Sequence, residues 1–420
     1  MTKKQYDVVI IGAGAAGCMA AIKAAERGKS ILLCERNASL GKKILITGNG
    51  RCNLTNVAPM NTFIEKFAHS GKFLRTAFAR LSNNDLIHFF TLKGLNFRTE
   101  DNGKIFPTTD KAKSIVSALE ECLHERKVTI VYNTQIASLK KEDLLFIIRT
   151  QDNRCIKATK VIIATGGSAY PKTGSDGSGA MLAQSLGHTL IPFSLALVPL
   201  KTAEHWVKDL QGLSFQNICM TVHSCNRKIT SEPGDILFTH FGLSGPLVID
   251  LSSMILSKMK NDGNIKITIN LVPKMTALEL QDKLTQASTN QGKTQINNLI
   301  NTFLPKRMTP LFLSLLNIKP EKILNQITKK ERLAIIEALK AFPLTIVGSL
   351  SLDQAMATNG GIDIDDLHQK TMESKIVPGL FIAGEIIDGR GPSGGYNLQQ
   401  AFSTGFLAGE SAAESLVSTE

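Results

Sequence analysis

The chain has 420 residues, 43% of them hydrophobic, which is enough for two or three domains with substantial cores. No stretch approaches the roughly 18 uninterrupted apolar residues of a membrane span, and the seven cysteines are scattered without a Cys-x-x-Cys pair. The formal charge of +12 comes from lysines and arginines spread along the chain, which favours an ordinary basic surface. We therefore expect a cytoplasmic protein with no membrane partner and no metal site. A nucleic-acid partner is the less favoured reading, and it stays open because a fold can gather dispersed charges onto one face.

The stretch from Tyr6 to Glu35 has the pattern of a dinucleotide-binding unit. Residues 7–11 form an apolar run typical of a buried strand, and the glycine-rich turn of residues 12–17 follows at once. Residues 18–27 predict a helix that ends before Gly28, and residues 30–34 predict a second strand. A glycine turn in another kind of α/β protein is the alternative, which the surrounding strand, helix and acid disfavour.

Each part of this stretch has an expected task. Gly12 allows a tight turn, Gly14 lets the backbone approach a pyrophosphate, and Gly17 lets the helix pack closely on the strand. The free N–H groups at the helix N-terminus favour the negative charge of the pyrophosphate. Glu35 lies about 20 residues further on, where an acid accepts hydrogen bonds from a ribose.

A segment rich in glycine, amides and hydroxyls, residues 37–56, follows the acid. In a dinucleotide-binding fold such a segment runs along the second half of the ligand. A flexible surface loop is the alternative, but the apolar triplet of residues 44–46 argues against it.

The next part of the chain alternates helical and extended patterns. Residues 63–94 and 111–126 predict helices, the second with Asp110 as N-cap. Residues 128–132, 135–140 and 144–150 predict strands of a meander. Residues 160–163 predict a buried strand that ends in Ala164-Thr165-Gly166-Gly167. The glycines there again allow the backbone to approach a neighbouring group closely.

The character of the sequence changes at about residue 191. Residues 219–223 and 265–271 read as strands, the segment from Gly234 to Pro246 interrupts them, and residues 276–341 are helical. Residues 378–385 restore the first domain with a buried strand, a glycine and an acid. We therefore predict an α/β fold with an FAD-binding Rossmann-like domain, residues 1–190 and 346–420. The inserted substrate or cap domain would span residues 191–345, β-rich over 191–275 and helical over 276–341.

Three predicted strands thus end in glycine-bearing loops, and in open α/β sheets ligands bind at the carboxyl ends of strands. A ligand that touches all three loops must be long, so FAD fits better than NAD. Glu385 is placed to bond ribityl hydroxyls, and the Gly394–Asn397 turn would aim the last helix, residues 398–416, at the flavin. A helix N-terminus there stabilises the negative charge of a reduced flavin.

These motifs together resemble the BaiN/YhiN-like family of bacterial FAD-dependent oxidoreductases, over essentially the whole chain. The resemblance implies a two-dinucleotide-binding flavoprotein fold with an inserted β-barrel-like domain that carries a helical subdomain. One departure is Asn49, where the family commonly has glycine. The residues expected to bind the cofactor are Gly12, Ala13, Gly14, Ala15, Ala16, Gly17, Glu35, Arg36, Lys43, Thr47, Gly48, Asn49, Gly50, Arg51, Cys52, Asn53, Ala164, Thr165, Gly166, Gly384, Glu385, Gly395, Tyr396, Asn397 and Leu398.

The expected function is hydride transfer between a small organic substrate and flavin N5. No second G-x-G-x-x-G follows a strand, so a dedicated nicotinamide domain is not expected and NAD(P)H would dock only transiently as reductant. O2, a quinone or another protein are alternative electron partners. Candidate catalytic residues are His240, Tyr170 and Arg390. His240 could donate a proton, although a lone histidine in such a loop is more often structural. Tyr170 and the loop from Gly234 to Pro246 would face the flavin ring and hold substrate, and Arg390 could bind a substrate carboxylate or be a solvated loop charge. For Cys52 we favour an inert, packed thiol. Two alternatives remain: an amine oxidase that uses O2, and a flavin-bound RNA- or protein-binding module.

Overall fold

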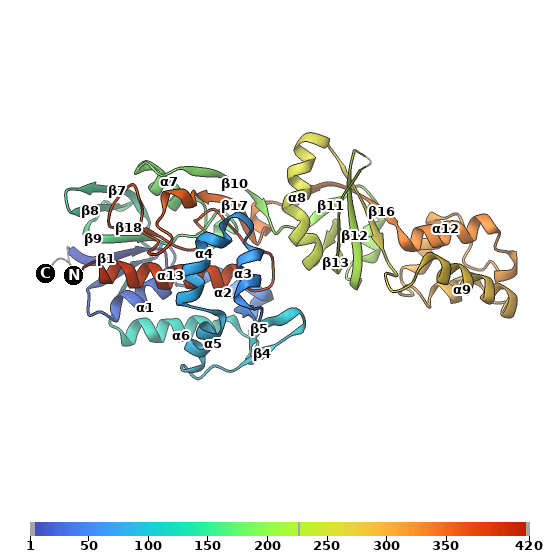
Figure 1. Ribbon diagram of the computed structural model, residues 1–420, viewed down its shortest axis with the longest axis horizontal. Coiled ribbons are helices and arrows are strands. Elements are labelled where there is room, and N and C mark those ends of the chain that lie inside the picture. The colour runs from blue at the N-terminus through green and yellow to red at the C-terminus, as the bar shows by residue number, and fades with distance from the viewer. Residues whose placement is uncertain (1–4, 226, 417–420) are drawn as a thin grey trace. The chain divides into compact units, whose positions relative to one another are not determined.

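The computed structural model describes residues 5–225 and 227–416 (Figure 1). The chain divides into two compact units, one of residues 1–196 and 352–420 and one of residues 197–351. The sequence analysis placed this division at residues 191 and 345. We describe the two units separately, as unit 1 and unit 2.

Unit 1 is a mixed α/β unit. Its helices are α1 (Ala15–Ala25), α2 (Lys42–Ile46), α3 (Met60–Lys66), α4 (Gly71–Arg80), α5 (Asn83–Thr91), α6 (Ala112–Glu125), α7 (Ser178–Ser185) and α13 (Tyr396–Glu414). Its strands are β1 (Gln5–Ile11), β2 (Ile31–Cys34), β3 (Thr55–Asn56), β4 (Phe97–Thr99), β5 (Lys104–Pro107), β6 (Thr129–Val131), β7 (Ile136–Glu142), β8 (Leu145–Thr150), β9 (Cys155–Ile163), β10 (Leu190–Ala196), β17 (Ala357–Ile362) and β18 (Leu380–Ile382).

The central sheet of unit 1 has the order β6-β2-β1-β9-β8-β7, and β18 pairs with β9. Strands β6, β2, β1, β9 and β18 pair in parallel, while β7, β8 and β9 form an antiparallel meander. The sequence analysis wrongly placed residues 128–132 in that meander. Helix α6 precedes β6 and lets it join the parallel side of the sheet beside β2 instead.

Helices α1 and α13 pack against each other without bulky side chains between them. Nine of the eleven residues of α1 are buried, and most of them are alanine or glycine. A Cβ atom on Gly405 of α13 would lie 2.2 Å from the backbone oxygen of Ala16, and one on Gly409 equally close to that of Ala20. The glycines therefore allow the short distance between the two helix backbones.

Two local expectations in unit 1 differ from the structure. Asp110 does not cap α6, whose N-cap is Lys111. The carboxylate of Asp110 instead accepts two hydrogen bonds from Arg98, at 2.7 and 2.6 Å, and a bidentate charged pair competes well with a helix cap. The polar segment of residues 37–56 is not a plain loop, because it contains α2 and a 3-10 turn at Thr47–Gly50.

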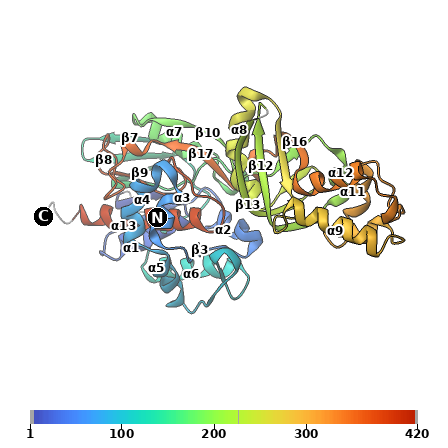
Figure 2. The same cartoon turned by 45° about the vertical axis from the view of Figure 1, so that its right-hand side comes forward.

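Unit 2 combines a closed barrel with a helical subdomain (Figure 2). The barrel has the order β11-β14-β13-β12-β15-β16. The segment from Gly234 to Pro246 does not interrupt the strands but supplies the end of β13, all of β14 and the start of α8. The elements are β11 (Leu200–Thr202), β12 (Ser214–Ser224), β13 (Arg227–Phe238), β14 (Gly242–Ser244), α8 (Pro246–Asp262), β15 (Ile265–Asn270), α9 (Ala277–Asn290), α10 (Ile296–Ile300), α11 (Thr309–Leu315), α12 (Lys329–Lys340) and β16 (Phe342–Ser349).

Among the described residues, no helix has both the length and the apolar character that a membrane span requires.

The packing of α1 on α13 yields the first prediction. Gly405→Ala places a methyl group on the backbone of Ala16, so we expect the free energy of unfolding to fall by about 1–3 kcal/mol, the usual cost of overpacking. Guanidinium titration followed by circular dichroism measures this change. Gly348→Ala is the matched control, because a Cβ there meets no atom within 4 Å. Equal stability of the two variants would contradict the proposed role of Gly405.

Candidate cofactor pocket

Four parallel strands of unit 1 end at the same level of the sheet. Ile11 at the end of β1 pairs with Cys34 of β2 and with Ile163 of β9, and Ile163 pairs with Ile382 of β18. The residues that follow these four ends, among them Gly12, are therefore neighbours at one edge. The register alone brings together segments that are up to 370 residues apart in the sequence.

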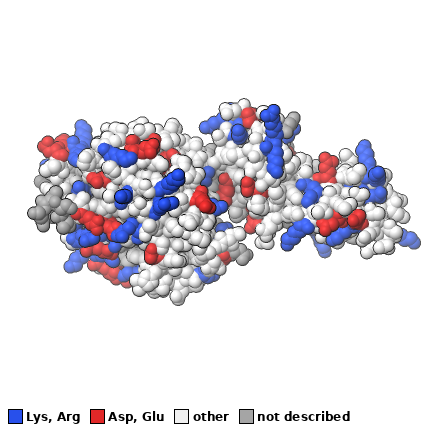
Figure 3. Space-filling model, in the orientation of Figure 1, with Lys and Arg blue, Asp and Glu red and all other residues white. Residues whose placement is uncertain are grey.

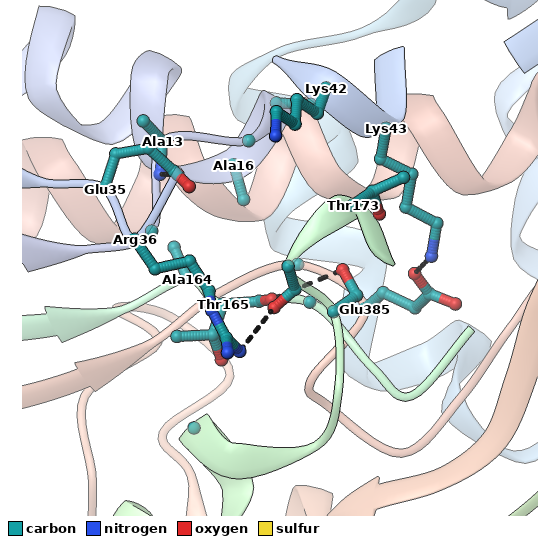
Figure 4. A pocket seen from close by; sticks show the side chains of 18 of the residues that line it. Ala13, Ala16, Glu35, Arg36, Lys42, Lys43, Ala164, Thr165, Thr173 and Glu385 are labelled. Carbon is teal, nitrogen blue, oxygen red and sulfur yellow. Dashed lines mark hydrogen bonds and ion pairs between the residues drawn. The ribbon is translucent and has the colours of Figure 1, made fainter. Parts of the chain in front are cut away.

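A pocket opens at this edge (Figure 4). Sixteen residues that the sequence analysis assigned to the cofactor line it: Gly12, Ala13, Gly14, Ala15, Ala16, Glu35, Arg36, Lys43, Thr47, Ala164, Thr165, Gly166, Gly384, Glu385, Asn397 and Leu398. Further lining residues are Ile11, Cys34, Asn37, Gly41, Lys42, Ile44, Thr134, Gln135, Ile136, Thr173, Gly174, Ser175, Ser178, Gly179, Leu182, Met356, Ala357 and Ala401.

Glu35 is the most tightly held acid of the pocket, with 6% of its surface exposed. One carboxylate oxygen accepts a hydrogen bond from the backbone N–H of Ala13, at 2.8 Å. The other accepts from the backbone and side-chain N–H groups of Asn37, at 2.8 and 2.7 Å. Through these three hydrogen bonds Glu35 fixes the glycine turn and joins it to the end of β2.

The side chain of Asn37 continues this network across the pocket wall. Its amide donates to the carbonyl oxygen of Thr173 at 2.9 Å, and its oxygen accepts from Lys42 at 3.1 Å. Beside it, Arg36 pairs with Asp176 at 2.5 Å. The loop after β9 is thereby joined to the end of β2. The sequence alone did not indicate these contacts, because Asn37 and Thr173 lie 136 residues apart.

Two helix N-termini meet at the pocket, those of α1 and α13. Neither N-cap, Gly14 or Gly395, makes a side-chain capping bond, and neither helix has an acid in its first turn. Their free N–H groups and positive dipole ends therefore favour an anionic or electron-rich ligand. A Cβ on Gly14 would meet no atom within 4 Å, so space for a ligand lies directly over this turn.

Lys43 and Glu385 form an ion pair inside the pocket, at 2.5 Å (Figure 4). Both side chains are largely buried, with 22% and 17% exposed. Glu385 also accepts a hydrogen bond from the backbone N–H of Thr358, at 3.3 Å. The pair links α2 to the loop after β18 and keeps the Glu385 carboxylate directed into the pocket.

Nine of the residues assigned to the cofactor do not line the pocket: Gly17, Gly48, Asn49, Gly50, Arg51, Cys52, Asn53, Gly395 and Tyr396. Gly17 supports the glycine turn from below, because a Cβ there would lie 1.8 Å from the backbone oxygen of Gly12. Arg51 packs over the ring of Phe106 at 4.2 Å and pairs with Glu100 at 2.7 Å.

The segment after Arg51 holds the start of α13. In the orientation that satisfies both of its polar atoms, the Asn53 amide accepts from the N–H of Gly395 at 3.0 Å and donates to the oxygen of Thr55 at 3.1 Å. Asn56 donates to the oxygen of Gly394 at 3.1 Å. These asparagines position the helix N-terminus that faces the pocket, a supporting role that the sequence analysis did not predict.

None of the three candidate catalytic residues lines the pocket. Tyr170 has φ of 53° and precedes the lining residue Thr173, and burial raises the pKa of its phenol. Arg390 donates to the side-chain oxygen of Asn359 at 2.6 Å. His240 is exposed, lies between β13 and β14 of unit 2, and contacts the ring of Phe241 edge-on.

Solved structures with the same fold include two enzymes. The open conformation of a flavocytochrome c3 fumarate reductase matches 98% of this chain and 78% of its own, with a TM-score of 0.54 and 15% identity. A 3-ketosteroid delta1-dehydrogenase from Sterolibacterium denitrificans matches 98% of this chain and all of its own, with a TM-score of 0.54 and 12% identity. The fold is the Rossmann type of FAD-binding proteins.

Sequence relatives narrow the class to FAD-dependent oxidoreductases. The 3-dehydro-bile acid delta(4,6)-reductase of Clostridium scindens is 33% identical over 96% of this chain and 98% of its own. The ribosomal RNA dihydrouridine synthase of Escherichia coli is 30% identical over 97% and 98%. The chain belongs to the family of the HI0933-like protein Rossmann domain, which matches residues 6–411. The family resemblance seen in the sequence is thereby confirmed.

The cysteines near the pocket yield the second prediction. Burial raises the pKa of Cys34 and of Cys52 to about 12, so only about one thiol in ten thousand is ionised at about pH 8. We expect iodoacetamide to label the exposed Cys155 and Cys225 of the native protein and to leave Cys34 and Cys52 unmodified. Peptide mass spectrometry measures the labelling, and unfolded protein is the control. Rapid native labelling of Cys52 would show that its thiol is not inert.

Proposed function

We propose that the pocket of unit 1 binds FAD. The observation that carries this proposal is the meeting of four strand ends with two uncapped helix N-termini around one pocket. The N–H groups at the start of α1 would hold the pyrophosphate, and Glu35 would accept from a ribose. Glu385, held by Lys43, would accept from ribityl hydroxyls, and the start of α13 would face the flavin.

We further propose that the enzyme adds a hydride to a carbon–carbon double bond of a small organic substrate, with NAD(P)H as transient reductant. When bound, FAD supplies the hydride-transfer chemistry. The chain itself contributes the positive ends of α1 and α13, which favour negative charge in the pocket. The relative from C. scindens is named for the reduction of double bonds, which supports this reaction type.

The proton that accompanies the hydride needs a donor. Tyr170 is a candidate because its phenol is protonated at neutral pH and it lies three residues before the lining residue Thr173, although burial raises its pKa and so makes it a weaker acid. His240 and Arg390 stay as further candidates, His240 as a donor and Arg390 as a group that binds a substrate carboxylate. Each of these assignments is a proposal.

A second candidate function is the reduction of a base in RNA. Two relatives, from E. coli and Haemophilus influenzae, are named ribosomal RNA dihydrouridine synthases and are 30% and 29% identical over at least 96% of this chain. Dihydrouridine arises when the double bond of a uracil ring is reduced, so the chemistry is the same and only the substrate differs. The net charge of +12 is compatible with a polyanionic substrate.

Anaerobic stopped-flow of the purified holoenzyme tests these proposals. We expect NADH or NADPH to bleach the flavin absorbance, and a conjugated enone or a uridine-containing RNA to restore it. Restoration by the enone alone supports the first function, and restoration by RNA alone supports the second. Bleaching by an amine with peroxide formed in air would establish an oxidase instead. A colourless protein that neither binds FAD nor melts at a higher temperature with it would overturn the proposal.

The open space over Gly14 gives a sharper test of the pocket. Gly14→Val fills the volume proposed for the pyrophosphate without meeting protein atoms, so we expect an unchanged melting temperature of the FAD-free protein. FAD affinity should fall at least about tenfold, as judged by fluorescence titration. Gly348→Val, at another open glycine, should leave FAD affinity unchanged. Full FAD affinity of Gly14→Val would place the cofactor elsewhere.

A further inference from the structure

The two units carry their charge in different ways. Unit 2 has 18 Lys and Arg against 11 Asp and Glu, a net charge of +7 in 155 residues. Unit 1 has 30 against 25, a net charge of +5 in 265 residues. Exposed cations of unit 1 often have carboxylate partners, as in Arg80 with Glu410, while the charge of unit 2 is concentrated in its helical subdomain. Residues 272–341 contain 11 Lys and Arg against 5 acids.

Five lysines of this subdomain gather where α9 ends and α12 begins; we call this region the basic end. Residues 292–296 run alongside residues 320–325, since the backbone N–H of Leu324 donates to Thr294 at 2.9 Å and that of Asn325 to Gly292 at 3.1 Å. Lys322 then pairs with Glu331 in the first turn of α12, at 2.7 Å. The basic end comprises Lys293, Lys319, Lys322, Lys329 and Lys330.

Four of these five lysines make no ion pair with any residue that the structure describes. The side chains of Lys293, Lys319, Lys329 and Lys330 are exposed, and among the described residues none of them makes an ion pair. Glu321 and Glu331 lie close in sequence, and Glu331 is already engaged by Lys322 and by the Thr328 cap. In Figure 3, Lys and Arg side chains project from the helical subdomain at the right of the view.

The position of Lys329 and Lys330 opposes the stability of α12. They are the first two residues of that helix, where the positive dipole end disfavours a cation. Folding alone therefore gives no reason for this placement. Because Thr328 and Glu331 already cap α12, an anion bound at the basic end would be stabilised by the lysines and not by the helix N-terminus.

We propose that the basic end binds the phosphate backbone of RNA. Lysine ammonium groups act as point charges toward phosphates and do not read bases. Residues 290–340 present no exposed aromatic ring on which bases would stack. The contact should therefore be electrostatic and independent of sequence, so that the choice of base would fall to the reaction site.

An anionic membrane surface fits the basic end less well. Binding in a membrane interface needs a continuous apolar face beside the cations. In α9 and α12 the exposed large apolar side chains are Leu278, with 67% of its surface accessible, and Leu333, with 50%. Leu278 lies in the first turn of α9, so of the two only Leu333 lies at the basic end. One leucine does not form such a face.

This inference goes beyond the reaction, because binding to RNA is measured without turnover. It rests on the second function proposed above, because both name RNA as the partner. The two fail differently: loss of RNA binding leaves reduction of the flavin by NAD(P)H intact, whereas failure of the reaction leaves salt-dependent RNA binding intact.

Fluorescence anisotropy of the full-length holoenzyme with a fluorescein-labelled RNA hairpin tests the proposal. The variant replaces Lys293, Lys319, Lys329 and Lys330 with Gln and keeps Lys322, which pairs with Glu331. We expect affinity to fall at least tenfold, and the slope of log K against log salt to become shallower by roughly 3, since each of the four lost phosphate contacts removes about 0.7–0.9. The rate of flavin reduction by NAD(P)H should not change.

The matched control removes the same charge elsewhere. Lys66, Lys111, Lys140 and Lys157 of unit 1 are exposed and have no ion pair among the described residues. Their replacement by Gln should leave the salt slope unchanged. An equal loss in the control would show a general charge effect and overturn the proposal. So would an absence of RNA binding by the wild type, or selective loss of binding to phosphatidylglycerol vesicles, which would assign the basic end to a membrane.

Discussion

The common register of the parallel strands is the constraint on which the structure of unit 1 depends. Backbone hydrogen bonds continue past the strand ends, from Gly12 to Cys34 and from Ala164 to Ile11, so the turns leave the sheet at the same level. Each turn must then bend sharply within a residue or two. Gly12 and Gly384 do so at positive φ, 101° and 87°, which a residue with a side chain adopts only with strain.

The small residues of α1 and α13 serve the same edge. Because the two helices approach to backbone contact, α13 crosses α1 close to the sheet, and its first residues reach the pocket that α1 also faces. Bulky side chains at Gly405 or Gly409 would push α13 away from α1. The positive N-terminal end of one of the two helices would then lie further from the pocket. Packing deep in the unit thus determines the electrostatics of the pocket.

The sequence predicted the parts of the site that depend on local pattern. Strand, glycine turn, helix and acid occur at fixed spacing, so the sequence could place Gly14, Glu35 and Glu385 at one candidate site, and all three line the pocket. It did not predict contacts between distant segments, such as Asn37 with Thr173, which only the folded chain defines. Helix α8 was also missed, because its start lies in a glycine-rich segment that reads as a loop.

The segment around Asn53, just before β3, shows why a ligand loop and a supporting segment look alike in sequence. Both are polar and glycine-rich, because both must bend and offer hydrogen bonds. The Asn53 amide satisfies the N–H of Gly395 and the oxygen of Thr55 at once. An aspartate would satisfy the first but not the second, and would place a negative charge at the start of α13, where it would compete with an anionic ligand. A neutral amide holds the helix and leaves its positive end available to the pocket.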